Sequence, residues 1–144
     1  MPDSLVFCCS DGRFHPQVED FIHARVSERP DFIALPGGPV GLDAWASSFD
    51  NARVCEEALR FLIEHHGIRS VWLIAHSGCG FYRHKHPGSS DEELRERQLR
   101  DLRSGRERLL QMAPSVSVHL VYASVKGPTV EFSEVPVPGT GGRR

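Results

Sequence analysis

The chain has 144 residues, with 17 Lys and Arg against 19 Asp and Glu, for a formal net charge of −2. Hydrophobic residues make up 40% and charged residues 25%, a composition typical of one globular domain that needs no disulfides. The charge balance argues against nucleic-acid binding. No apolar run approaches the ~20 residues of a membrane span. The start at Met1–Ser4 lacks the features of a signal peptide, so we expect a cytoplasmic protein with no membrane partner.

Strands and helices are predicted to alternate along the chain. Short apolar runs that end in turn residues predict strands, and apolar residues three and four positions apart predict helices. In chain order, we expect a strand at 4–9, a helix at 17–26, a strand at 32–35, irregular backbone at 36–39, a helix at 51–66, a strand at 71–75, a polar loop up to residue 90, a helix from there to about 112, a strand at 116–123 and an edge strand at 129–132.

Two of these helices have clear signals. Val54, Ala58, Phe61 and Leu62 follow the spacing of one apolar helix face, and Gly67 supplies the stop. The sequence from Ser90 to Glu93 has the form of a capping box. The helix that it opens carries alternating charges, which we interpret as a solvated face.

This alternation predicts an α/β fold: a parallel four-stranded sheet with helices on both faces and an edge hairpin strand near the C-terminus. No linker divides the chain, so we expect a single domain over residues 1–135. A flexible tail is predicted over residues 136–144, which hold two prolines and three glycines. In such sheets, sites form beyond the carboxyl ends of the strands, where Cys9 and His76 both fall.

The four cysteines are better suited to metal binding or nucleophilic chemistry than to a disulfide framework, because two of them are adjacent and we expect a reducing compartment. Cys9, His76 and Cys79 offer two thiolates and one imidazole, a donor set that suits Zn²⁺ with one coordination position left free. Asp11 could then orient a zinc-bound hydroxide, and Arg13 could keep Asp11 ionised. Alternation along a strand puts Cys8 on the opposite face from Cys9.

The two clusters, Cys9-Ser10-Asp11-Gly12-Arg13 and His76-Ser77-Gly78-Cys79, resemble the Cys-x-Asp-x-Arg and His-x-x-Cys zinc motifs of the beta-class carbonic anhydrases. The helix at 51–67 and the segment at 121–127 resemble other parts of that family, in the same order. The resemblance implies Zn²⁺ on Cys9, His76 and Cys79, with Asp11 and Arg13 as the catalytic dyad. It implies reversible hydration of carbon dioxide to bicarbonate by attack of zinc-bound hydroxide, in a homodimer or higher homo-oligomer.

The chain also departs from the family pattern. Leu35-Pro36-Gly37-Gly38 stands where the family usually has Arg-Asn-Ala-Gly, and Phe81 follows Gly80 where a second glycine is usual. Because Cys9 lies so near the first residue of the sequence, we expect no counterpart of the helical arm with which that family contacts a partner subunit. Relatives with this metal site also hydrolyse carbonyl sulfide or carbon disulfide, so a related zinc hydrolase is one alternative. A non-catalytic zinc-binding module is another.

A third function and the roles of several further residues also have to be considered. A redox or nucleophilic cysteine enzyme ranks third, because it gives Asp11 and Arg13 no role. Cys8 and Cys55 are expected in the core. His84 and His86 could carry protons to solvent, although an exposed polar loop is the simpler interpretation. Phe81 and Tyr82 could line a pocket or serve only in packing.

Overall fold

A computed structural model describes residues 2–26 and 28–137. Its five-stranded sheet has the order β2-β1-β3-β4-β5, in which the first four strands are parallel and β5 is antiparallel to β4. The predicted parallel sheet with an edge hairpin strand is therefore confirmed. The strands span Ser4–Cys9 (β1), Asp31–Leu35 (β2), Ser70–His76 (β3), Ser117–Lys126 (β4) and Thr129–Glu134 (β5).

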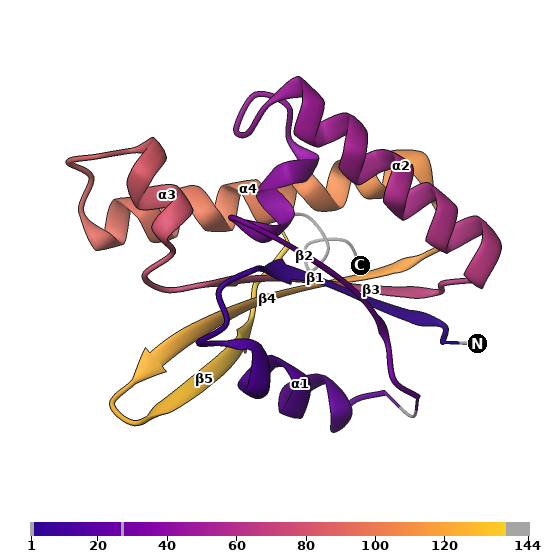
Figure 1. Ribbon diagram of the computed structural model, residues 1–144, viewed down its shortest axis with the longest axis horizontal. Helices are drawn as coiled ribbons and strands as arrows, with labels where there is room; N and C mark the ends of the chain where they lie inside the picture. Colours follow the sequence, from indigo (N-terminus) through magenta and orange to yellow (C-terminus); the bar gives the residue numbers. More distant parts are fainter. Residues whose placement is uncertain (1, 27, 138–144) are drawn as a thin grey trace, which may run out of the picture.

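Helices cover both faces of this sheet, as Figure 1 shows, with α1 on one side and α2 and α4 on the other. They span His15–His23 (α1), Phe49–His66 (α2), Gly80–Lys85 (α3) and Asp91–Met112 (α4), and a 3₁₀ helix, η1, spans Gly38–Leu42. The capping box at Ser90 is present, because the Ser90 hydroxyl accepts from the Glu93 amide and the Glu93 carboxylate accepts from the Ser90 amide. Ser48 caps α2, and Gly67 ends it in a left-handed conformation.

Successive residues of β1 face different layers, since side chains alternate across a strand. Cys8 packs in the cluster under α1, with Val18 and Ile22 of that helix. Cys9 lies on the other side, against Val40 and Cys79. The prediction that the two adjacent cysteines face apart is confirmed. Cys55 is also in the core as expected, at 1% exposure.

Three local predictions differ from the structure. Residues 80–85 are expected within a loop but form the short helix α3. Its sequence has no apolar periodicity from which a helix could be predicted. The segment at 36–39 is irregular only at its start, because η1 begins at Gly38. Helix α1 begins at His15 rather than at Gln17, since Pro16 fits the first turn of a helix, where its missing N–H costs nothing.

The domain bounds stay a prediction. At the end of the described chain, the Pro136 carbonyl accepts a hydrogen bond from Arg103 Nε at 3.0 Å, and Val137 packs against the core. The remaining part of the predicted flexible tail, 138–144, lies outside the described residues. Among the described residues, no helix has both the length and the hydropathy that crossing a membrane requires.

Candidate metal centre

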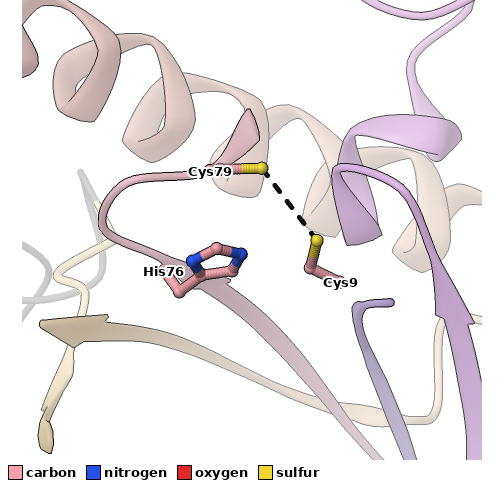
Figure 2. Close-up of side chains that lie close together, drawn as sticks. All are labelled: Cys9, His76 and Cys79. Atoms are coloured by element: carbon pink, nitrogen blue, oxygen red, sulfur yellow. Dashed lines mark hydrogen bonds between the residues drawn. The ribbon is translucent and has the colours of Figure 1, made fainter. Parts of the chain in front are cut away.

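Two neighbouring strands bring Cys9 and His76 to the same edge of the sheet. Cys9 is the last residue of β1 and His76 the last of β3, and the two strands pair in parallel. A tight turn through Gly78, whose φ is +67°, then brings Cys79 back to the same place. One ligand atom from each of Cys9, His76 and Cys79 lies within 4.8 Å of the other two. In Figure 2 the two sulfur atoms face each other and the imidazole ring lies beside them.

His76 is oriented as a metal ligand would need to be. Its Nδ1 lies 2.7 Å from the Ser77 carbonyl oxygen, and because a carbonyl can only accept, the ring proton is on Nδ1. Nε2 then carries the free lone pair. It is buried and has no hydrogen-bond partner within the described part of the chain. Buried polar atoms are rarely left unpaired, so this nitrogen fits a site for a cation.

The thiols of Cys9 and Cys79 are hydrogen-bonded to each other. Cys9 Sγ and Cys79 Sγ are 4.0 Å apart, and their hydrogen bond lowers the pKa of Cys9 well below its ordinary value and raises the pKa of Cys79. The backbone amides of Tyr82 and Phe81 act in the opposite direction on the Cys79 pKa. Metal binding would release the protons that these thiols carry, since thiolate is the form that ligates.

The other two cysteines are thiols held in apolar surroundings. Burial raises the pKa of Cys8 to about 12 and that of Cys55 to about 11. Neither belongs to the group of possible ligands found among the described residues.

The donor set fits Zn²⁺. Two thiolates bound at about 2.3 Å in a tetrahedral arrangement would lie about 3.8 Å apart, close to the observed separation of the sulfur atoms. With one imidazole added, Cys9, His76 and Cys79 could fill three of the four tetrahedral positions, as protein ligands do in catalytic zinc sites.

Asp11 and Arg13 form a bidentate salt bridge beside Cys9, His76 and Cys79. Arg13 Nη2 lies 2.6 Å from Asp11 Oδ2 and Arg13 Nε lies 3.0 Å from Oδ1, and the Arg13 amide also donates to Oδ1 at 3.0 Å. These hydrogen bonds from Arg13 lower the pKa of Asp11 to about 2. Asp11 Oδ2 is 3.9 Å from His76 Nε2, so an ionised carboxylate stands next to the unpaired nitrogen. Arg13 itself is largely exposed.

The two glycines after β2, Gly37 and Gly38, lie close to the end of β1. Gly38 has φ of +60°, and a Cβ at this position would lie 2.9 Å from the backbone of Cys8 and Cys9. A side chain would therefore push η1 away from the end of β1. The Gly37 amide also contributes to lowering the pKa of Cys9. The Pro36–Pro39 segment thus packs directly against the strand that carries the first candidate ligand.

Sequence reasoning missed three residues that hold the turn between His76 and Cys79 directly or through another side chain: Gln98, Tyr122 and Asp101. Gln98 Nε2 donates to the His76 carbonyl at 2.8 Å, and Gln98 Oε1 accepts from the Tyr122 hydroxyl at 3.1 Å. The Tyr82 hydroxyl donates to Asp101 Oδ2 at 2.6 Å. Tyr82, for which the sequence predicts either a pocket or a packing role, is buried at 4% exposure. No sequence signal separates Gln98 and Asp101 from the other polar residues of α4.

A cavity of about 580 Å³ opens beside Cys79. Its walls include Cys79, Tyr82 and Tyr122, whereas Asp11 and Arg13 are not among the residues that line it. His84 lies on α3, and His86 is the residue that caps the end of this helix. Burial lowers the pKa of His86. Nothing in this geometry selects either histidine for proton transfer.

No protein-family model matches the chain, and no curated protein matches it. Solved structures do. A beta-carbonic anhydrase of Aspergillus fumigatus, CafD, is 13% identical with a TM-score of 0.63, covering 94% of this chain and 90% of its own. Carbonic anhydrase from Streptococcus mutans is 13% identical with a TM-score of 0.62, and the match covers 94% of this chain and 83% of that one. A tetrameric beta-carbonic anhydrase of Sordaria macrospora is 15% identical with a TM-score of 0.57, and the match covers 91% of this chain and 80% of that one. The chain therefore has the fold of the beta-carbonic anhydrases.

Proposed function

We propose that the protein is a zinc-dependent lyase that reversibly hydrates carbon dioxide to bicarbonate. The observation that carries this proposal is the pairing of Asp11 with Arg13 beside a buried group of two thiols and one imidazole. The fold supports it, because the solved structures that this chain resembles are described as carbonic anhydrases. Cys9, His76 and Cys79 would hold the metal.

In carbonic anhydrases with three histidine ligands, Zn²⁺ lowers the pKa of its bound water to about 7, which makes water a nucleophile at neutral pH. Two thiolates neutralise more of the charge of the cation than imidazoles do. Orientation of the attacking water then matters more, and Asp11 can supply it by accepting a hydrogen bond. Because the salt bridge with Arg13 keeps the Asp11 pKa at about 2, Asp11 is an acceptor throughout the neutral range.

The test is stopped-flow carbon dioxide hydration by zinc-replete protein, at about pH 7, near the pKa that Zn²⁺ gives its bound water in the three-histidine enzymes, and at about pH 8.5, well above it. We expect a rate clearly above background at the higher pH at least. Replacement of Asp11 by Asn removes the anionic acceptor and should lower this rate by about 100-fold or more while zinc stays bound. Asp50→Asn, an exposed carboxylate on α2, is the matched control and should leave the rate unchanged.

Other outcomes select the alternatives. If Asp11→Asn kept the full rate, the dyad assignment would be wrong. Bound zinc without carbon dioxide hydration, but with turnover of carbonyl sulfide or carbon disulfide, would favour the related hydrolase. Bound zinc with no turnover of any of these would favour the non-catalytic module. Activity that survives complete removal of metal by a chelator would favour a cysteine nucleophile.

We also propose that the protein acts as a homodimer or higher homo-oligomer. Val54 and Phe61 on α2 are 57% and 54% exposed, which is unusual for an apolar face of a helix. Val54, Ala58, Phe61 and His65 follow the alternating four- and three-residue spacing of helices that pair along a seam. A twofold axis near Ala58 would place Val54 of one copy against Phe61 of the other. Sedimentation velocity at micromolar concentration should show a dimer or larger species.

A cytoplasmic location is part of the proposal as well. All four cysteines are free, which suits a reducing compartment, and the candidate site needs two of them as thiolates. Fractionation of cells that express the tagged protein would test this location. Recovery in an oxidising compartment would contradict it.

A further inference from the structure

One polar side chain of α4, Gln98, contacts the turn that carries two of the candidate ligands, and a second, Asp101, reaches it through Tyr82. Gln98 and Asp101 are three residues apart in sequence, so they lie on neighbouring turns of one helix face. Gln98 is only 3% exposed. A buried amide far from the helix ends costs stability unless all of its polar atoms find partners, so its position calls for an explanation.

Gln98 holds the His76 end of the turn. The pairing of β3 with β1 stops at Leu73, whereas its pairing with β4 continues to His76, so the last residues of β3 have a strand on one side only. Gln98 Nε2 donates to the His76 carbonyl at 2.8 Å. Its Oε1 accepts from Tyr122 of β4, whose hydroxyl is 3.1 Å away. The amide therefore ties the end of β3 to β4 through a fully buried contact.

Asp101 holds the Cys79 end. Helix α3 begins at Gly80, directly after Cys79, and the Arg83 amide donates to the Cys79 carbonyl at 3.2 Å. Tyr82 in the first turn of α3 is buried, and its hydroxyl donates to Asp101 Oδ2 at 2.6 Å. Any shift of Asp101 would move the start of α3 and with it Cys79.

We propose that Gln98 and Asp101 are positioning residues for the metal centre, each holding one end of the His76–Cys79 turn from helix α4. The inference rests on the metal ligands of the proposed function, but it does not depend on the substrate. Neither residue contacts the metal; each acts through the backbone or through a tyrosine. The turn brings the ligand atoms of His76 and Cys79 within 4.8 Å of each other and of Cys9, and both of its ends are held from α4.

The test compares metal binding by single variants of the full chain. Gln98→Met keeps the length of the side chain and removes both hydrogen bonds, and it should weaken Zn²⁺ binding by about 10- to 100-fold, as loss of a supporting contact around a metal site does. A competing chromophoric chelator measures that affinity. The visible absorption bands of the Co²⁺-loaded protein should shift as well, because they report the geometry of the ligands.

Asp101 is tested by a pair of substitutions. Asp101→Asn can still accept a hydrogen bond from the Tyr82 hydroxyl and should retain Zn²⁺ affinity. Asp101→Leu cannot accept this hydrogen bond, and its Zn²⁺ affinity should fall to a similar extent as that of Gln98→Met. Gln111→Met makes the same chemical change at an exposed position of α4 and should have no effect. Leu102→Ala, which empties a core position on the same helix, should destabilise the fold without changing the Zn²⁺ affinity or the Co²⁺ spectrum of the folded protein.

The proposal is overturned if Gln98→Met binds Zn²⁺ as tightly as the unchanged protein, or if Leu102→Ala weakens binding equally. Failure of carbon dioxide hydration would leave these affinities measurable and would affect the proposed function alone. Failure of the unchanged protein to bind metal would remove the metal centre. The ¹⁵N chemical shifts of the His76 ring in the metal-free protein would then decide whether Gln98 positions it: a shift in Gln98→Met supports this role and no shift excludes it.

Discussion

Helices α2 and α4 cover the same face of the sheet but differ in which residues they bury. Half of the apolar stripe of α2 is turned away from the core: Val54 and Phe61 are more than half exposed, whereas Leu62 packs against the core and Cys55 and Leu59, outside the stripe, are buried. Helix α4 has the more polar sequence, yet it buries Gln98 together with Leu94, Leu102 and Leu109. An apolar stripe therefore predicts a helix but does not show which surface the stripe packs against. A polar residue can be buried in a core when its hydrogen bonds are satisfied there.

The largest expected effect concerns the outward face of α2. Phe61→Glu places a charge at the proposed seam between two copies, where burying an unpaired carboxylate is strongly unfavourable. We expect the oligomer to dissociate into folded monomers, as measured by sedimentation velocity together with circular dichroism. Arg53→Glu, on another face of α2, is the control and should leave the oligomer intact. An unchanged oligomer in Phe61→Glu would remove this face from the interface.

A second prediction compares the two helices directly. Leu102→Ala in α4 leaves a cavity in the core and should lower the free energy of unfolding by about 2–5 kcal/mol. Phe61→Ala, at an exposed position of α2, should lower it by no more than about 0.5 kcal/mol when measured on the monomer. Urea denaturation at low protein concentration provides both values. Equal losses would mean that the stripe of α2 packs within its own chain.

A third prediction concerns how stability depends on pH through His119, next to Trp72 on the sheet face that α1 covers. His119 stacks on Trp72 with ring centroids 4.0 Å apart, and burial lowers the pKa of His119 below its ordinary value. The unfolded chain therefore binds a proton at a higher pH than the folded chain does. Stability from this residue is present above about pH 6.5 and is lost as the pH falls from there towards the folded pKa. His119→Phe should flatten this part of the profile, as measured by thermal unfolding at several pH values.

The smallest expected effect is at Gly105, a buried glycine in the middle of α4. A Cβ there would meet Leu42 at 3.4 Å and Leu73 at 3.6 Å, which are ordinary contacts. Glycine costs a helix about 1 kcal/mol relative to alanine, so Gly105→Ala should raise the free energy of unfolding by about 0.5–1 kcal/mol. A loss instead would show that α4 lies closer to η1 and β3 than these contacts indicate.

Much of the candidate site could be predicted because it depends on short-range rules. Strand ends of a parallel sheet share an edge, so Cys9 and His76 are expected to meet, and the turn at Gly78 returns Cys79 within three residues. Asp11 and Arg13 are two residues apart and pair locally. The role of these residues as metal ligands and dyad is still a prediction, which zinc binding and Asp11→Asn will decide.

Other features could not be predicted because their causes are distant in sequence. Helix α3 has six residues and no apolar period, and Tyr82 within it is held by Asp101, 19 positions later. Gln98 looks like any polar residue of a charged helix, and only the His76 carbonyl, 22 positions earlier, gives it a partner. Local pattern carries no information about such pairs.

The sequence by itself determined the alternation of strands and helices, the sheet with its edge hairpin, and the meeting of two short motifs at one edge, because periodicity and chain connectivity fix these. Only the tertiary structure decided which side of α2 packs inward and which polar side chains of α4 are buried. Those choices depend on the free energy of packing one complete surface against another, and no single segment contains that information.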